Sequence, residues 1–491
     1  MKISIKKNIT WNLMSNVLPF IAGIIFFPLI IKAYGNERFG ILTLAWALVG
    51  YFGLFDLGLS RALTQIISEK ISEKLSKAKI AQLIHTGFYL MWALGALGGF
   101  ILFAISPFIA NQFLKAPSNL YEESIVAFSY LAVSIPIVVH SSAMRGVLEA
   151  LHLFKSSSLI RMIIGVGTFA VTYFASLFGA TLPHAILGLI GTRMMGWIFY
   201  WIAIRKTKIL KPETKKLHKV WLKPLFSFGG WITLSNLIGP LMVYTDRFVI
   251  MALLGAGSVA YYVAPYEVIT KMWAIPAAIS GVLFPVFAKT YKNNIHQTSV
   301  LLKNGLHYLL MLIYPLILFA VLFAKEWMSF WLDSDFAAHG NYVVCWLSLG
   351  ILLNSYAQII YANIQGSGRA DWTAKLHIVE VLPYLVILFF SLKHWGINGA
   401  AFAWFIRSLI DLLGLVFLSA RLSKSYKKAM YVSLTVMSFG MLPLVTSLID
   451  LSLYYRTLLC LATLFIYGVL SVYQLKKDKL FNYLSYEMKS R

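Results

Sequence analysis

The chain has 491 residues, of which 59% are hydrophobic and only 13% are charged. A soluble globular protein carries about 25% charged residues, so this composition excludes a water-soluble domain and predicts an all-α protein that crosses a lipid bilayer many times. The net charge of +24 does not indicate nucleic acid as a partner, because the basic residues form short clusters between apolar runs, as in positive-inside membrane topology.

Apolar runs of about 20 residues, the length that crosses a bilayer as a helix, follow one another from end to end. The sequence predicts about fourteen such helices, at 10–34, 39–65, 81–111, 124–150, 156–179, 183–205, 224–253, 258–288, 299–323, 341–365, 372–392, 397–420, 429–449 and 455–475. With the N-terminus inside, the basic tracts at 205–223 and 421–428 fall on the cytoplasmic side. We therefore expect a multi-pass membrane protein with both termini in the cytoplasm.

The two halves of the chain resemble each other. "WNLMSNVLP" (11–19) is similar to "WITLSNLIGP" (231–240), and the same offset aligns Gly35 with Gly255; "AILGLIGTR" (185–193) is similar to "GAAFAWFIR" (399–407). Duplicated halves related by an axis along the membrane normal are found in secondary transporters, which bind substrate between the halves at the midplane. The sequence predicts a six-helix lobe at 1–206, a basic cytoplasmic linker at 207–223, a second six-helix lobe at 224–420, and two extra helices with a cytoplasmic tail at 421–491.

Charged residues inside membrane spans are costly and usually functional. Asp56 and Arg61 lie toward the cytoplasmic end of the second predicted helix, and Arg145, spaced to pair with Glu149, lies similarly in the fourth. Others lie closer to the midplane or, for the last two, in the outer third of the seventh helix: His140, Arg193, Glu267, Lys271, His307, Arg407, Asp246 and Arg247.

Each of these residues also has a structural interpretation. Glu267 with Lys271, and Arg407 with Asp411, have the i,i+4 spacing of ion pairs that neutralise each other. Arg61 could anchor the helix at the headgroups, and the histidines could be hydrogen-bonded core groups. Arg193 has no acid three or four residues away, so it needs a partner from another helix or an anionic ligand.

Motifs for covalent chemistry and cofactors are missing from the sequence. There is no G-x-x-x-x-G-K-[ST] loop for ATP, no H-E-x-x-H and no Cys/His cluster. No predicted outer loop is long enough for a catalytic domain. We expect no enzyme activity, no cofactor and no metal site.

Several stretches resemble the oligosaccharide (Wzx-type O-antigen) flippases of the multidrug/oligosaccharidyl-lipid/polysaccharide exporter superfamily. They are "IIKAYGNERFGILTLAWALVGYFGLFDLGLSRALTQ" (30–65), "MRGVLEAL" (144–151), "TDRFVIMALLGAGSVAYYVAPYEV" (245–268), "IQGSGRADWTAKLHIVEVLPYL" (364–385) and "GINGAAFAW" (396–404). The resemblance implies two six-helix lobes plus two C-terminal helices, alternating access, and a polyprenyl-diphosphate-linked oligosaccharide moved to the outer leaflet for surface polysaccharide assembly. The first predicted helix has no Arg, unlike the first helix of lipid II flippases, so a peptidoglycan-precursor role is less expected.

On this resemblance a diphosphate needs cations, and Arg suits bidentate phosphate contacts. The candidates for binding it are Arg145, Arg193, Arg247, Lys271 and Arg407. The candidates for coupling or gating are Asp56, Arg61, Asp246 and Glu267. Expected partners besides the substrate and the bilayer are a coupling ion, proton or sodium, and other polysaccharide-assembly membrane proteins. The alternatives are a multidrug cation antiporter of the same superfamily and a membrane-embedded glycosyltransferase or polymerase.

Overall fold

The computed structural model describes residues 5–51, 58–113, 118–210, 216–226, 244–446 and 451–477, and within these ranges it contains helices but no strand. The chain divides into two compact units, residues 1–260 and 261–491. Asp56, one of the predicted gating residues, lies outside the described residues. The division into six-helix lobes with a linker at 207–223 stays a prediction.

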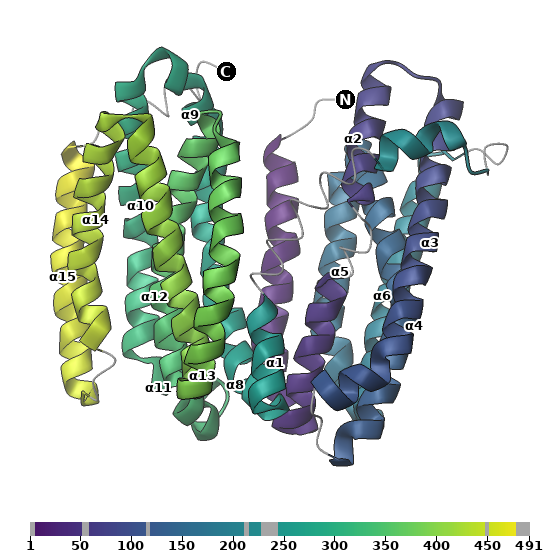
Figure 1. Cartoon of the computed structure of the whole chain (residues 1–491), viewed down its shortest axis with the longest axis horizontal. Coiled ribbons are helices and arrows are strands. Elements are labelled where there is room, and N and C mark those ends of the chain that lie inside the picture. Colours follow the sequence, from purple (N-terminus) through teal and green to yellow (C-terminus); the bar gives the residue numbers. More distant parts are fainter. Residues whose placement is uncertain are drawn as a thin grey trace. The chain divides into compact units, whose positions relative to one another are not determined.

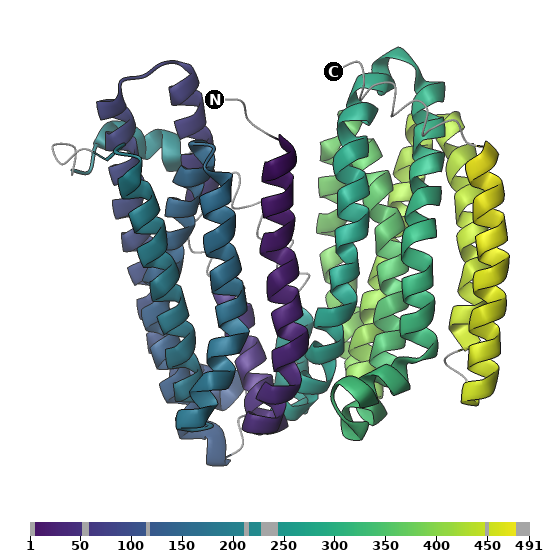
Figure 2. The same ribbon diagram turned by 180° about the vertical axis from the view of Figure 1, so that it is seen from behind.

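The first unit is a helical bundle (Figures 1 and 2). Its helices are α1 (Ile5–Tyr51), α2 (Leu59–Ser72), α3 (Lys77–Phe108), α4 (Tyr121–Ala150), α5 (Phe154–Ala175) and α6 (Leu182–Lys206). Helix α4 packs against α2, α3 and α6, while α5 packs against α1 and α6. The helices α1, α4, α5 and α6 thus enclose the interior in which the candidate site lies.

The second unit is built around α12 (Ser334–Gly366), which packs against α9 (Ala274–Asn293), α10 (Ile295–Leu322), α11 (Ala324–Trp331) and α13 (Ala370–Leu422). Helix α8 (Ala256–Ile269) crosses the boundary between the units and is followed by a short 3₁₀ turn. The last two helices, α14 (Lys424–Val445) and α15 (Leu453–Lys477), both contact α10. The short helix α11 was not expected from the sequence.

Glycines break the longest helices. Helix α1 turns at Gly35, where φ is 75°, and α13 turns at Gly396, where φ is 57°. These angles lie in the left-handed region, which only glycine enters without steric cost. The breaks separate the predicted spans 10–34 and 39–65, and 372–392 and 397–420. Gly255, which the internal repeat aligns with Gly35, also has a positive φ of 85°.

The described helices include ten ranges that are long and apolar enough to cross a membrane. Eight of them correspond to one predicted span each, and the two broken at a glycine, 14–50 and 370–422, overlap two each. The predicted span 39–65 ends within α2 and includes residues 52–57, which are not described. The other two predicted spans, 224–253 and 429–449, include residues whose placement is not described. Large apolar side chains such as Phe100, Phe178 and Phe465 are exposed, as expected where lipid is the solvent. The protein is an all-α polytopic membrane protein.

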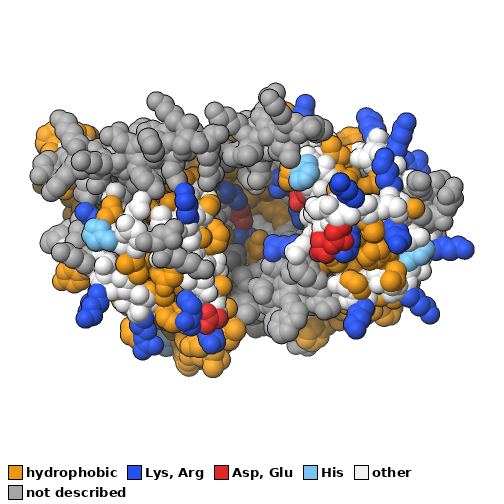
Figure 3. All heavy atoms as spheres, turned by 90° about the horizontal axis from the view of Figure 1, so that it is seen from above, with side chains coloured by type: hydrophobic (Ala, Val, Ile, Leu, Met, Phe, Trp, Pro, Cys, Tyr) orange, Lys and Arg blue, Asp and Glu red, His pale blue; other side chains and the backbone are white. Residues whose placement is uncertain are grey.

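The two ends of the first unit differ in charge. One end, the basic end, carries Lys70 at the end of α2, Lys77 at the start of α3, and Arg205 and Lys206 at the end of α6. The backbone N–H of His218 donates to Thr86 Oγ1 over 3.1 Å, so part of the basic tract packs against α3. Figure 3 shows a face of the molecule on which Lys and Arg side chains far outnumber Asp and Glu. This asymmetry is the pattern that the positive-inside rule describes.

Gly40 provides a test of helix packing in the first unit. A Cβ added at Gly40 would lie 1.9 Å from the carbonyl oxygen of Ala256, whereas one added at Gly257 would meet nothing within 4 Å. We expect Gly40→Ala to destabilise the protein by about 1–3 kcal/mol, as overpacking does, and Gly257→Ala to be neutral. Thermal unfolding of the purified variants in detergent measures both, and equal melting temperatures would contradict the close approach at Gly40.

Candidate functional site

The candidate site is a cavity of about 450 Å³ inside the first unit, which we call the arginine cavity. Residues from α1, α4, α5 and α6 line it. Its polar lining consists of three arginines and five hydroxyls: Arg145, Arg161, Arg193, Ser15, Ser141, Ser142, Thr168 and Tyr200. The lining residues include no Asp or Glu, so the cavity has a strongly positive potential.

The three arginines lie at different depths from the basic end. Arg145 lies five residues before the end of α4, Arg161 seven residues after the start of α5, and Arg193 thirteen residues before the end of α6. At 1.5 Å per residue these positions are about 8, 10 and 20 Å from the helix ends. The cations therefore lead from the basic end to the middle of the helices.

Arg193 is the deepest of the three and is held loosely. Its Nη2 lies 3.4 Å from Thr168 Oγ1, at the limit of hydrogen-bond distance. Its Nε is buried and has no hydrogen-bond partner in the described part of the chain. An unsatisfied buried cationic donor is costly. The sequence left two options for Arg193, a partner from another helix or an anionic ligand. Helix α5 supplies only one weak contact, and no described acid pairs with Arg193, so the anionic ligand is the option that remains.

The predicted pairing of Arg145 with Glu149 is wrong. No ion pair joins the two side chains among the described residues, and the Glu149 carboxylate instead accepts a hydrogen bond of 3.1 Å from Ser157 Oγ on α5. Arg145 lines the arginine cavity. The i,i+4 spacing allowed the pair, but a neighbouring helix offered Glu149 a hydroxyl donor instead.

Arg247 and Asp246 lie near the cavity, on helical residues that follow the undescribed segment 227–243. Both side chains are buried. The Arg247 guanidinium lies 5.0 Å from the ring centre of Tyr244, a cation–π contact. A Cβ added at Gly50, which lines the cavity, would lie 3.7 Å from the Tyr244 hydroxyl. Tyr244 is therefore close both to Arg247 and to the cavity lining at Gly50.

The other predicted site residues are not brought into the cavity. Lys271 donates to Glu267 over 3.0 Å, and both side chains are partly exposed, so the ion pair that their i,i+4 spacing allows is formed. Arg61 is exposed on α2. Arg407 belongs to the second unit, and no ion pair joins it to Asp411 in the described residues; its guanidinium lies 5.6 Å from the ring centre of Tyr384.

Two features were missed from the sequence. Arg161 was not among the predicted substrate-binding residues, yet it lines the cavity beside Arg145 and Arg193. In the second unit, His377, Glu380 and Asp411 bring their side-chain nitrogen and oxygen atoms within 4.8 Å of one another. The i,i+3 spacing of His377 and Glu380 was a signal for this cluster, but Asp411 joins it only through the fold of α13.

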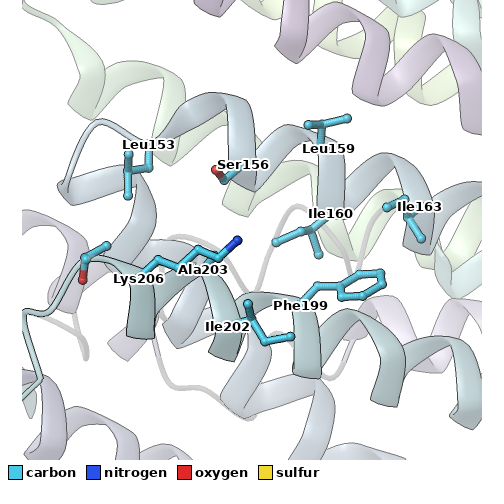
Figure 4. A pocket seen from close by; sticks show the side chains of 10 residues that line it. Leu153, Ser156, Leu159, Ile160, Ile163, Phe199, Ile202, Ala203 and Lys206 are labelled. Carbon is cyan, nitrogen blue, oxygen red and sulfur yellow. The ribbon is translucent and has the colours of Figure 1, made fainter.

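A second cavity of about 480 Å³ lies between α5 and α6 (Figure 4). Leu159, Ile160, Ile163, Phe199 and Ile202 supply most of its lining, and Lys206 is its one charged residue. Such an apolar groove suits a hydrocarbon chain better than a diphosphate, because a diphosphate requires several cationic donors. The arginine cavity is therefore the better candidate for an anionic ligand.

Comparisons with known proteins agree with this architecture. The family model described as "Polysaccharide biosynthesis protein" matches residues 5–291. A Shigella flexneri protein provisionally named as an O-antigen transporter is 31% identical over 430 residues, 87% of this chain and 100% of its own. A Haloferax volcanii protein provisionally named as a low-salt glycan biosynthesis flippase is 24% identical, over 80% of this chain and 78% of its own.

Among solved structures, the lipid II flippase MurJ in an inward closed conformation is similar, with a TM-score of 0.72 and 17% identity. The match covers 95% of this chain and 99% of that one. At this identity the likeness shows the fold alone, and it shows that the two-lobe helical fold is shared. Because the family model matches more than half of its residues and one relative matches along its whole length, the chain belongs to the polysaccharide biosynthesis protein family.

Proposed function

We propose that this protein is a flippase that moves a polyprenyl-diphosphate-linked oligosaccharide from the cytoplasmic to the outer leaflet of the bacterial plasma membrane by alternating access. It makes and breaks no covalent bond. The observation that carries the proposal is the arginine cavity, in which three arginines and five hydroxyls meet without a lining acid. The diphosphate of such a substrate needs a site with several cationic and hydroxyl donors, since Arg binds phosphate oxygens in bidentate fashion.

The relatives support the class of substrate. The Shigella flexneri relative is named for O-antigen transport, the Haloferax volcanii relative for flipping in glycan biosynthesis, and the similar solved structure is a lipid II flippase. Two of these names refer to O-antigen or glycan and two to flipping, and we take a glycan carried on a lipid as the substrate of this protein. In this protein the glycan would pass through the protein while the polyprenyl chain stays in the bilayer.

The two alternatives have less support. A multidrug cation antiporter needs a cavity that attracts cations, and a lining with three arginines and no carboxylate repels them. A glycosyltransferase or polymerase needs catalytic groups, whereas the Shigella flexneri and Haloferax volcanii relatives are named for transport and flipping.

The finer parts of the proposal follow from charge. We place the basic end of the first unit in the cytoplasm, and both chain termini with it. Arg145 and Arg193, with Arg161, bind the diphosphate. Arg247, Lys271 and Arg407 contact the substrate in other conformations, while Asp56, Arg61, Asp246 and Glu267 act in gating or coupling to a proton or sodium gradient. Other polysaccharide-assembly membrane proteins receive the product.

The proposal is tested with the full chain in proteoliposomes. The probe is a short fluorescent polyprenyl-diphosphate oligosaccharide, and dithionite quenching reports how much of it has crossed the bilayer. We expect protein-dependent crossing of this probe and much slower crossing of the matched polyprenyl monophosphate, which has fewer oxygens for the arginines. Equal rates for the two probes would contradict diphosphate recognition, and uptake of ethidium without lipid crossing would favour the antiporter.

A further inference from the structure

Three titratable side chains meet in the second unit, between the two halves of α13. The break at Gly396 folds these halves against each other, so that a Cβ added at Gly399 would touch the carbonyl of Ser391. Glu380 on the first half and Asp411 on the second are only 4% and 5% exposed. His377 Nε2 lies 3.3 Å from Asp411 Oδ1, and the nearest atoms of all three lie within 4.8 Å of one another.

The carboxylates of this cluster are poorly satisfied for their burial. Both oxygens of Glu380 are buried without a hydrogen bond in the described part of the chain, and the buried Oδ1 of Asp411 has only the 3.3 Å contact with His377 Nε2. A buried carboxylate without a hydrogen bond is strongly destabilised in its ionised form. Two ionised carboxylates this close also repel each other. The state of the cluster in which both acids are ionised is therefore unfavourable.

The charges around Glu380 indicate how many protons would make the cluster neutral. The charged groups that act on Glu380 within the described residues are Asp411, His377 and Arg407, and the neutral rings nearby are Tyr384 and, from α12, Tyr361. Two carboxylates and one guanidinium give this group a formal charge of −1. Adding one proton makes it neutral.

We propose that Glu380 and Asp411 share one exchangeable proton, and that His377 passes this proton between them and water. The His377 side chain is 33% exposed and lies seven residues from the start of α13, about 10 Å from the helix end, and its ring takes the proton from water at that end. Parallel stacking on Tyr361, with ring centres 5.5 Å apart, fixes the ring. The imidazolium then gives the proton from Nε2 to Asp411 Oδ1, and one carboxylic acid donates to the other carboxylate. No other bond forms or breaks.

This proton determines how tightly the halves of α13 pack. When it is bound, one of the two negative charges is removed and the repulsion across the hairpin is relieved; when it leaves, two carboxylates within 4.8 Å of each other repel. The inference deepens the coupling part of the proposed function, because it names the proton as the coupling ion and places its site. It does not depend on the arginine cavity, which lies in the first unit.

Infrared difference spectra of the purified full chain, recorded during pH steps in nanodiscs without Na⁺, test the proposal. We expect a carbonyl stretching band of a protonated carboxyl group at neutral pH, where exposed acids are ionised. The band should be lost in Glu380→Gln and lost or shifted in Asp411→Asn. The matched control is Asp371→Asn, which removes an exposed acid of the same helix that pairs with Arg369, and it should leave the band unchanged.

Binding of the polyprenyl-diphosphate probe is measured on the same samples. Because the arginine cavity lies in the first unit and Glu380 in the second, the Glu380→Gln variant should bind the probe as the wild type does. A pH gradient should, however, no longer accelerate crossing of the probe. A band that persists in both Glu380→Gln and Asp411→Asn would overturn the proposal, as would a band that disappears on adding Na⁺ at constant pH. Absence of the band from wild type at every pH would also overturn it, whereas loss of probe binding in all samples would instead count against the proposed substrate.

Discussion

Replacing Arg193 with methionine should weaken binding of the polyprenyl-diphosphate probe about 10- to 100-fold. A hydrogen bond to a charged group contributes about 1.5–3 kcal/mol, and each 1.4 kcal/mol corresponds to a factor of about ten in the dissociation constant. Arg193 is the deepest cation of the arginine cavity, and its Nε has no described hydrogen-bond partner. Its donors are therefore available for phosphate oxygens.

The same substitution should leave the melting temperature of the ligand-free protein unchanged or raise it. Methionine fills a similar space without a buried charge, and replacing incompletely paired buried charges by apolar side chains is often neutral or stabilising. Opposite changes in binding and stability distinguish a ligand-binding arginine from a structural one. A structural arginine would lower both when removed.

The control for this experiment is Arg205→Met on the same helix. Arg205 lies at the end of α6, where its guanidinium is 5.2 Å from the ring centre of Trp201 and is exposed. Its removal should change neither probe affinity nor stability by more than a small factor. Binding is measured by displacement of the fluorescent probe in nanodiscs, and stability by thermal unfolding. Unchanged affinity in Arg193→Met would remove Arg193 from the proposed site.

The order and extent of most helices could be predicted from the sequence, because lipid as a solvent requires long apolar runs and glycines mark the breaks at 35 and 396. That Arg193 has no acid partner on its own helix could also be predicted, because a lone cation is conspicuous in an apolar run; that it binds a ligand stays a prediction. Both inferences need only the sequence of a single helix and no contact between helices.

What depends on contacts between helices could not be predicted. Arg161 lines the cavity only because α5 packs between α1 and α6. Glu149 bonds to Ser157 rather than Arg145 because of how α5 follows α4. Asp411 meets Glu380 only through the hairpin of α13. Spacing along one helix determines which residues can pair, and the neighbouring helices determine which of them do.

The second prediction with a large expected effect concerns the ion pair at the end of the first unit opposite the basic end. There Arg38 donates from Nε and Nη2 to the Glu123 carboxylate at 2.9 Å, and the backbone N–H of Leu182 donates to the same carboxylate. One acid thus joins α1, α4 and the start of α6. We expect Glu123→Ala to destabilise the protein by roughly 1–3 kcal/mol, less than the 3–5 kcal/mol of a fully buried pair, because the Arg38 side chain is 33% exposed.

Glu122 provides the control, since it precedes Glu123 on α4 and is exposed. Glu122→Ala should leave the melting temperature unchanged, although both substitutions remove one acid from the first turn of α4 and alter its helix-dipole interaction equally. The double variant Arg38→Ala with Glu123→Ala should be more stable than the sum of the single effects predicts, because neither charge is then left unpaired.

Because the pair joins three helices at one end of the bundle, its loss should also increase the crossing rate of the diphosphate probe if opening of this end limits transport. A rate that stays constant while the melting temperature falls would restrict the Arg38–Glu123 pair to a structural role.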